Sequence, residues 1–257
     1  RYFSPATPGE LNDSGYLGLV ADTEFSVTRG FYDTPFTVAI TSATASASVY
    51  WTTNGSPPSP TNGTLYTAPV SVTGNTFLRA AAFLANHVPS VPVTHTYLFL
   101  NQVLQQPNNP PGYPTTWQAS YPADYEMDPN VVNHPNYGTT LSNDLRAIPT
   151  LSLVSDHNTF WHPSTGIYVD ATRSGILWER AASVELFNGD NTSEFQINCG
   201  VRMQGNASRD NVRLAKHAFR LLFKSAYGPS KLDHDWFGGG VSRFDNIVLR
   251  ACFTDSW

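Results

Sequence analysis

Short runs of alternating apolar and polar residues, separated by turns, fill the first part of the chain. Phe36, Val38 and Ile40 alternate with polar neighbours, and the runs ASVYWTT, TLYTAPVSV, TFLRAAAF and VTHTYLFL follow at intervals of about ten residues. The segments between them carry the Asn-Gly, Pro-Pro and Gly-Asn pairs that are typical of turns. This spacing predicts an Ig-like antiparallel β-sandwich over residues 36–98.

The segments that flank this region have a different composition. Residues 1–35 are rich in Pro, Gly, Thr and Asp and have no helical period, so we predict a connector there. Four prolines between residues 105 and 117 remove ladder donors and disfavour helix before each of them. We therefore predict a Pro-rich linker over residues 99–123, with a second domain after it at residues 124–257.

The second domain is again rich in β-strand patterns. The string FQINCGVRMQG places one set of alternating residues on an apolar face (Phe195, Ile197, Cys199, Val201 and Met203). The other set forms a polar face (Gln196, Asn198, Gly200, Arg202 and Gln204). Further candidate strands are PTLSLVSD, GILWERAASVELF, HAFRLLFKS and FDNIVLRACF, and Asn143 offers a helix start. The chain as a whole is thus expected to be mostly β, with a sandwich followed by a β-rich α+β lobe.

Composition narrows the possible partners. The 257 residues carry a formal net charge of −5, and only 14% of them are charged, which argues against a nucleic-acid partner. No apolar run reaches the ~18 residues of a membrane-spanning helix. Two cysteines, Cys199 and Cys252, are too few for a disulfide framework. We expect buried thiols on strands of one sheet, and a disulfide between them stays open.

Familiar catalytic and metal-binding motifs are absent from the sequence. None of the strings GxGxxG, Walker A, HExxH or GxSxG occurs. His157 and His162, with Asp156 nearby, lack a third ligand, so a capped turn is expected there and no metal site. The acidic residues of KLDHDW, Asp233 and Asp235 around His234, lie in a loop where alternating side chains rarely converge.

Two glutamates of the string WERAASVEL suggest a glycosidase pair that geometry excludes. Glu179 and Glu185 are six positions apart on one predicted strand, which separates them by ~20 Å, whereas such chemistry needs ~5 to 10 Å. We instead expect Glu179 to form ion pairs, with Arg202 or Arg220 on neighbouring strands as partners.

Residues 36–98 resemble a known small β-domain. The strings VYWTTNGSPPSP, LYTAPVSV and TFLRAAAF resemble, in order, the turn and strand signatures of the chitobiase/β-hexosaminidase C-terminal domain and the related fibronectin type III-associated repeat. Tyr50, Trp51 and Tyr66 suggest an aromatic platform for sugar rings on this sandwich. Tyr50 and Trp51 point to opposite faces, so one of them is expected in the core.

Residues 124–257 resemble the N-terminal part of the CotH-type spore-coat protein kinase family. The strings that carry the resemblance include DYEMDP, IPTLSLVSD, CGVRMQGNASR, AKHAFRLLFKSAYG and LRACFTDSW. The resemblance implies an atypical kinase-like fold in which a β-rich lobe holds nucleotide phosphates, with ATP and magnesium as cofactors of the intact parent protein. It also implies that the catalytic and magnesium-binding aspartates lie beyond Trp257.

By motif match, Arg202, Ser208, Arg209 and Lys216 fall in the family's RGxxSR…KxSxR/K segment. Lys216 is the leading phosphate contact, and Arg220, two strand positions after Ala218 on the same face, would assist it. The alternative interpretation is a set of solvated strand charges.

Three functions remain open at this point. The first is a nucleotide-holding lobe of an atypical kinase within a secreted or surface-attached bacterial multidomain protein. The second is a non-catalytic adhesion module that contacts glycan or a cell-surface protein. The third is a hydrolase without a recognisable motif.

Overall fold

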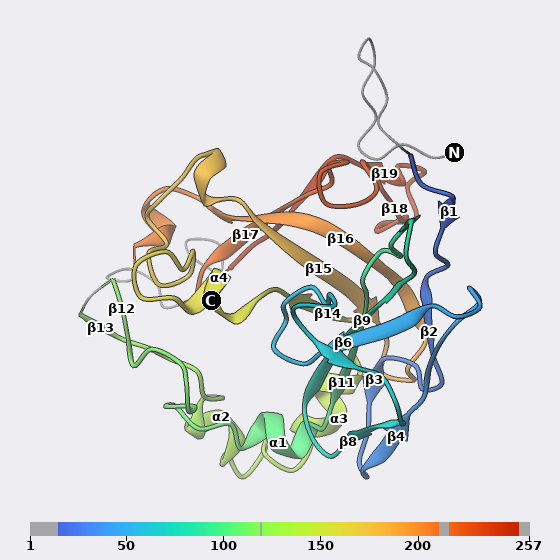
Figure 1. Ribbon diagram of the computed structural model, residues 1–257. Helices are drawn as coiled ribbons and strands as arrows, with labels where there is room; N and C mark the ends of the chain where they lie inside the picture. The colour runs from blue at the N-terminus through green and yellow to red at the C-terminus, as the bar shows by residue number, and fades with distance from the viewer. Residues whose placement is uncertain (1–14, 119, 211–215, 252–257) are drawn as a thin grey trace.

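The computed structural model describes residues 15–118, 120–210 and 216–251. Two β-rich domains lie side by side (Figure 1), joined by a segment that carries short helices. None of the described helices combines the length and apolar character needed to cross a membrane. The chain is mostly β, as the sequence predicts.

The first domain is a β-sandwich. Its larger sheet has the strand order β3 (Gly30–Phe31), β11 (Val93–Leu98), β9 (Thr76–Phe83), β6 (Ser48–Thr52) and β7 (Thr64–Leu65). Three two-stranded pairs complete it: β2 (Thr23–Phe25) with β5 (Ile40–Ser42), β4 (Phe36–Val38) with β8 (Val70–Val72), and β1 (Gly18–Leu19) with β10 (His87–Val88). Val38, Val72, Leu78 and Tyr97 are fully buried between these strands. Alternation along short strands therefore builds the core.

The sandwich begins earlier than the sequence pattern predicts. Strands β1, β2 and β3 all lie within residues 1–35, which were expected to form a connector. Each has two or three residues, too few to show a period of two, and β1 and β3 pair in parallel with strands far along the chain. The part of the expected connector before residue 15 lies outside the described residues.

The second domain is built on an antiparallel sheet. Its strand order is β14 (Thr150–Val154), β15 (Arg180–Phe187), β16 (Ser193–Gln204), β17 (Ala218–Leu222) and β20 (Asn246–Leu249). A small pair follows, β18 (Leu232–Asp233) with β19 (Arg243–Phe244), and the single-turn helices are α4 (His157–Trp161), η1 (Ile176–Trp178) and η2 (Ala207–Arg209). The predicted alternation of β16 is confirmed, since Ile197, Cys199, Val201 and Met203 are all buried in one core. We refer to the opposite side as the polar face of the second sheet.

Cys199 behaves as a core residue. It is completely buried on β16, and burial raises the pKa of its thiol to about 12. Cys252 lies outside the described residues, so the expectation that both thiols share a sheet, and whether they pair, stays a prediction.

The predicted linker, residues 99–123, contains a short helix and a pair of strands. The sandwich runs directly into α1 (Leu100–Leu104), and β12 (Thr116–Trp117) pairs with β13 (Tyr121–Pro122). Trp117 is 2% exposed because it packs among aromatic rings of the second domain. The chain continues through α2 (Pro129–Val132), where Pro129 is in the first turn, and α3 (Leu141–Arg146), which starts two residues before Asn143.

A buried ionic contact joins the two domains. Glu185 on β15 has no exposed surface, and its Oε1 lies 3.1 Å from Nε of Arg29, at an angle that makes an ion pair without a directed hydrogen bond. The same carboxylate accepts hydrogen bonds from the backbone N–H of Thr96 at 3.2 Å and from its hydroxyl at 2.5 Å. Arg29 also donates to the Phe195 carbonyl at 3.2 Å. Removing one partner of such a buried pair leaves an uncompensated charge.

Neutral hydrogen bonds surround this contact. The Asn191 carboxamide accepts from the Phe31 N–H at 2.7 Å and donates to its carbonyl at 3.1 Å. This close approach requires Gly30, with φ of 140°, because a Cβ there would lie 2.2 Å from the Asn191 side chain. Asn198 donates to the Pro92 carbonyl at 3.0 Å. Beside these polar contacts, Phe31 of the sandwich packs against Phe187 of the second domain in a small apolar cluster.

Burial raises the pKa of the Glu185 carboxyl to about 7, against the opposing effects of the Arg29 charge and the Thr96 hydrogen bonds. Between an unfolded-state pKa of ~4.3 and about 7, the folded state binds more protons here than the unfolded state does. We compare the free energy of unfolding of the native chain with that of Glu185→Gln. We predict that the native value minus the variant value falls as the pH rises from about 5 to 8. Urea unfolding at a series of pH values measures it, and a difference that rises with pH would contradict the prediction.

Candidate functional site

Two arginines face each other on the polar face of the second sheet. Arg202 on β16 and Arg220 on β17 are direct partners in the antiparallel register, while the next pair, Met203 and Phe219, belongs to the apolar core. Like charges in directly opposite positions destabilise a sheet unless other groups compensate them. This arrangement therefore needs an anion.

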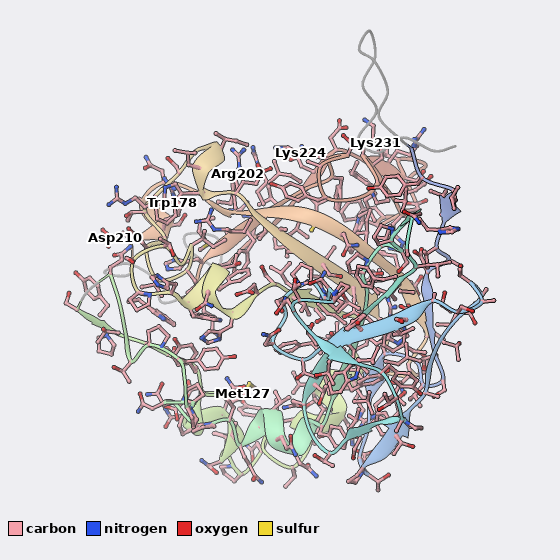
Figure 2. All side chains as sticks on the ribbon, viewed as in Figure 1. Met127, Trp178, Arg202, Asp210, Lys224 and Lys231 are labelled. Atoms are coloured by element: carbon pink, nitrogen blue, oxygen red, sulfur yellow. The ribbon has the colours of Figure 1, made fainter. Side chains whose placement is uncertain are left out.

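Further cationic groups gather around this pair. A cavity of about 140 Å³ is lined by Trp178, Gly205 and four arginines, which are Arg173, Arg202, Arg209 and Arg220. Arg209 comes from η2, and Trp178 ends η1. Figure 2 shows Arg202, Trp178 and Lys224 along the same side of the molecule. We call this cavity the arginine pocket.

A buried carboxylate neutralises one side of the arginine pocket. The side chain of Glu179 is 2% exposed. Its carboxylate accepts hydrogen bonds from Arg202 Nε at 2.6 Å, from Lys224 Nζ at 2.8 and 2.9 Å, and from the Tyr227 hydroxyl at 2.8 Å. Burial alone would raise the pKa of Glu179, but hydrogen bonds from Lys224, Tyr227 and Arg202 together hold it below its ordinary value. The predicted ion pair between Glu179 and Arg202 is thus present in the structure.

The other arginines are less completely paired. Arg173 forms an ion pair with Asp170 at 2.9 Å, and the Arg209 guanidinium donates to the Arg173 carbonyl at 2.9 Å. Within the described part of the chain, no carboxylate pairs with Arg209 or Arg220, and the buried Nε atoms of both lack a hydrogen-bond partner. Buried donors without partners are costly, so these two Nε atoms are an exception to the usual pairing of buried polar groups.

The structure brings together two of the four residues that the motif match selects, Arg202 and Arg209, and with them Arg220, which was expected to assist from the same strand face. Ser208 packs against Gly205 at the edge, and its carbonyl oxygen lies 3.2 Å from His217 Nδ1. Lys216 is exposed and does not line the pocket. Sequence reasoning missed Arg173 and Trp178, since the TRSGILW segment has no strand or helix period that places it against β16.

The aromatic residues of the sandwich do not form one platform. Trp51 and Tyr66 pack against the sandwich core. Tyr50 lies on the opposite face, where its ring centroid is 5.7 Å from that of Phe83 in an edge-to-face contact. The three side chains therefore do not present a shared stacking surface.

The remaining sequence candidates have structural roles. Asp156 caps α4 by accepting from the Asn158 N–H at 2.8 Å, next to His157. His234 packs against Phe195 and Trp236. Over residues 15–118, 120–210 and 216–251, no group of three His, Cys, Asp or Glu side chains is arranged to hold a metal ion.

Comparison with known proteins finds a family match for the sandwich. Residues 27–94 match the chitobiase/beta-hexosaminidase C-terminal domain. The expected resemblance of the sandwich is thereby confirmed, with a start at residue 27 instead of 36. No curated protein and no solved structure matches the chain. The resemblance of the second domain to CotH-type kinases stays a prediction.

Glycine 200 allows Glu179 and Tyr227 to approach β16. A Cβ at Gly200 would lie 2.5 Å from the Tyr227 ring and 3.2 Å from Glu179 Oε1. We predict that Gly200→Ala lowers the free energy of unfolding by about 1–3 kcal/mol, since the ring has to move. Chemical denaturation measures it, with Gly239→Ala, which has open space around it, as the matched control. Equal stability of the two variants would show that Tyr227 yields freely.

Proposed function

We propose that the second domain holds the phosphate groups of a nucleotide in the arginine pocket, as the β-rich lobe of a CotH-like atypical kinase. The observation that carries the proposal is the convergence of Arg202, Arg209 and Arg220 on one cavity, with two guanidinium Nε atoms unpartnered among the described residues. The planar guanidinium group suits phosphate oxygens because it presents paired donors.

The size of the pocket favours a phosphoryl group over a whole nucleotide. Its volume of about 140 Å³ is below the ~300 Å³ at which small-molecule sites usually begin. The nucleoside would then lie outside the cavity. The partly buried Trp178 ring is already covered by the guanidinium groups of Arg173 and Arg180, which lie 5.8 and 5.5 Å from its centroid. The proposal places this domain in a secreted or surface-attached bacterial multidomain protein.

Calorimetric titration with ATP and magnesium, and separately with inorganic pyrophosphate, tests the site. We expect Arg220→Ala to weaken binding of both ligands by about tenfold or more, and Arg220→Lys to restore only part of it because lysine lacks the planar fork. Lys231→Ala is the matched control, since Lys231 pairs with Asp245 and does not line the pocket. Wild-type affinity in Arg220→Ala would refute the site.

The chain by itself is expected to hold phosphate without transferring it. Glu179 and Asp170, the carboxylates paired with pocket arginines, are both engaged with cations and so do not offer magnesium ligands. Phosphoryl transfer also needs ligands for magnesium and a group that orients the nucleophile, which arginines do not supply. Incubation with labelled ATP, magnesium or manganese and a generic protein acceptor should leave the acceptor unlabelled. Labelling that disappears in Arg220→Ala would show a complete active site.

A further inference from the structure

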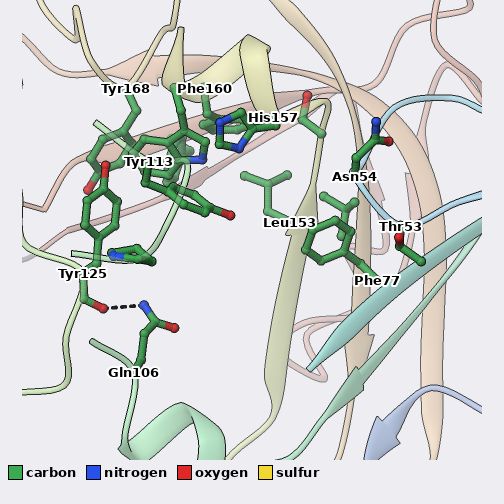
Figure 3. A pocket seen from close by; sticks show the side chains of 15 residues that line it. Thr53, Asn54, Phe77, Gln106, Tyr113, Tyr125, Leu153, His157, Phe160 and Tyr168 are labelled. Carbon is green, nitrogen blue, oxygen red and sulfur yellow. Dashed lines mark hydrogen bonds between the residues drawn. The ribbon is translucent and has the colours of Figure 1, made fainter. Parts of the chain in front are cut away.

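A larger cavity opens between the two domains, away from the arginine pocket. It has a volume of about 630 Å³, within the ~300 to 1,000 Å³ range of small-molecule sites. Thr53, Asn54 and Phe77 of the sandwich form one wall, and Leu153 of β14 lies beside them (Figure 3). The opposite wall consists of aromatic side chains from the linker and the second domain. We call this cavity the aromatic cleft.

The rings of the aromatic wall pack against one another. The ring of Tyr113 makes edge-to-face contacts with His157, Tyr125 and Trp161, at centroid distances of 4.7, 5.5 and 5.6 Å. Trp161 in turn stacks on the buried Trp117 at 6.4 Å. Each ring is held by its neighbours, so a ligand that packs on this wall orders few side chains on binding.

Among the described residues that line the aromatic cleft, none is Asp, Glu, Lys or Arg. A phosphorylated or otherwise charged ligand would lose water there without gaining a partner charge, which is unfavourable. The aromatic cleft therefore selects an uncharged ligand.

Hydrogen-bonding groups along the walls are nevertheless available. In the described part of the chain, the Tyr113 hydroxyl, Asn54 Nδ2 and Gln106 Oε1 have no protein partner. Asn54 and Gln106 are fixed through their other atoms, since Asn54 Oδ1 accepts from Ser56 and Gln106 Nε2 donates to the Tyr125 carbonyl. Burial raises the pKa of Tyr113, so its hydroxyl stays neutral and able to donate. Sugar hydroxyls can pair with these three groups, whereas a purely apolar ligand cannot.

We propose that the aromatic cleft binds a short, uncharged oligosaccharide. The C–H faces of pyranose rings, which carry partial positive charge, pack on the negative faces of the aromatic rings. The sugar hydroxyls pair with Tyr113, Asn54 and Gln106. Because both domains contribute walls, the site exists only while the domains stay joined.

Tryptophan fluorescence and calorimetry on the full chain test the proposal. The neutral ligands are the trimers of β-1,4-linked glucose, of α-1,4-linked glucose and of N-acetylglucosamine. A trimeric uronate is the charged comparison. We expect saturable binding of at least one neutral trimer and about tenfold weaker binding of the uronate. Tyr113→Ala should lower the affinity about tenfold, and Tyr113→Phe, which keeps the ring and the fold, about threefold or more. Tyr137→Ala, an exposed ring stacked on His134 outside the cleft, should bind as the native chain does.

Several results would overturn the proposal. They are the absence of saturable binding by every neutral trimer up to about 10 mM, equal binding of the uronate, and native affinity in both Tyr113 variants. If an apolar dye binds in the cleft and none of the sugars displaces it, the cleft would be assigned to an apolar ligand instead. Loss of phosphate binding in Arg220→Ala leaves all these measurements unaffected, so the two proposals fail separately.

Discussion

The buried carboxylate of Glu185 is the contact on which the arrangement of this chain depends. It joins a strand of the second sheet to Arg29 and Thr96 of the sandwich, in a place without exposed surface. A charge taken out of water in this way is tolerated only when its partners are held in position, so the interface admits few alternative geometries. The walls of the aromatic cleft are also linked directly, since the His157 N–H donates to the Asn54 carbonyl at 3.2 Å.

The polar face of the second sheet has two uses along its length. Toward one end, Glu185 and Asn198 contact the sandwich. Toward the other end, Arg202 and Arg220 form the arginine pocket, with Glu179 as the neutralising carboxylate. Glu179 and Glu185 stand six positions apart on one extended segment, so the same face both fixes the domains and concentrates positive charge. A strand with strict alternation makes this division possible.

Local patterns predicted the parts of this account that depend on near neighbours. The two faces of β16 follow from the alternation between Phe195 and Gln204, and the Glu179–Arg202 ion pair follows from the proximity of adjacent strands. The pairing of Arg29 with Glu185 could not be predicted, since 156 positions separate the two residues and only the packing of the domains unites them. Strands of two residues, such as β3, carry no period, and Arg173 reaches the pocket from an irregular segment.

The most direct test of the central claim observes the arginine Nε–Hε groups by NMR while pyrophosphate is added to the full chain. The arginine pocket predicts that the resonances of Arg209 and Arg220, whose Nε atoms are buried without partners, shift in a saturable way. The resonance of Arg29, committed to Glu185 between the domains, should stay in place. Unchanged resonances of Arg209 and Arg220 at saturating pyrophosphate would contradict the account.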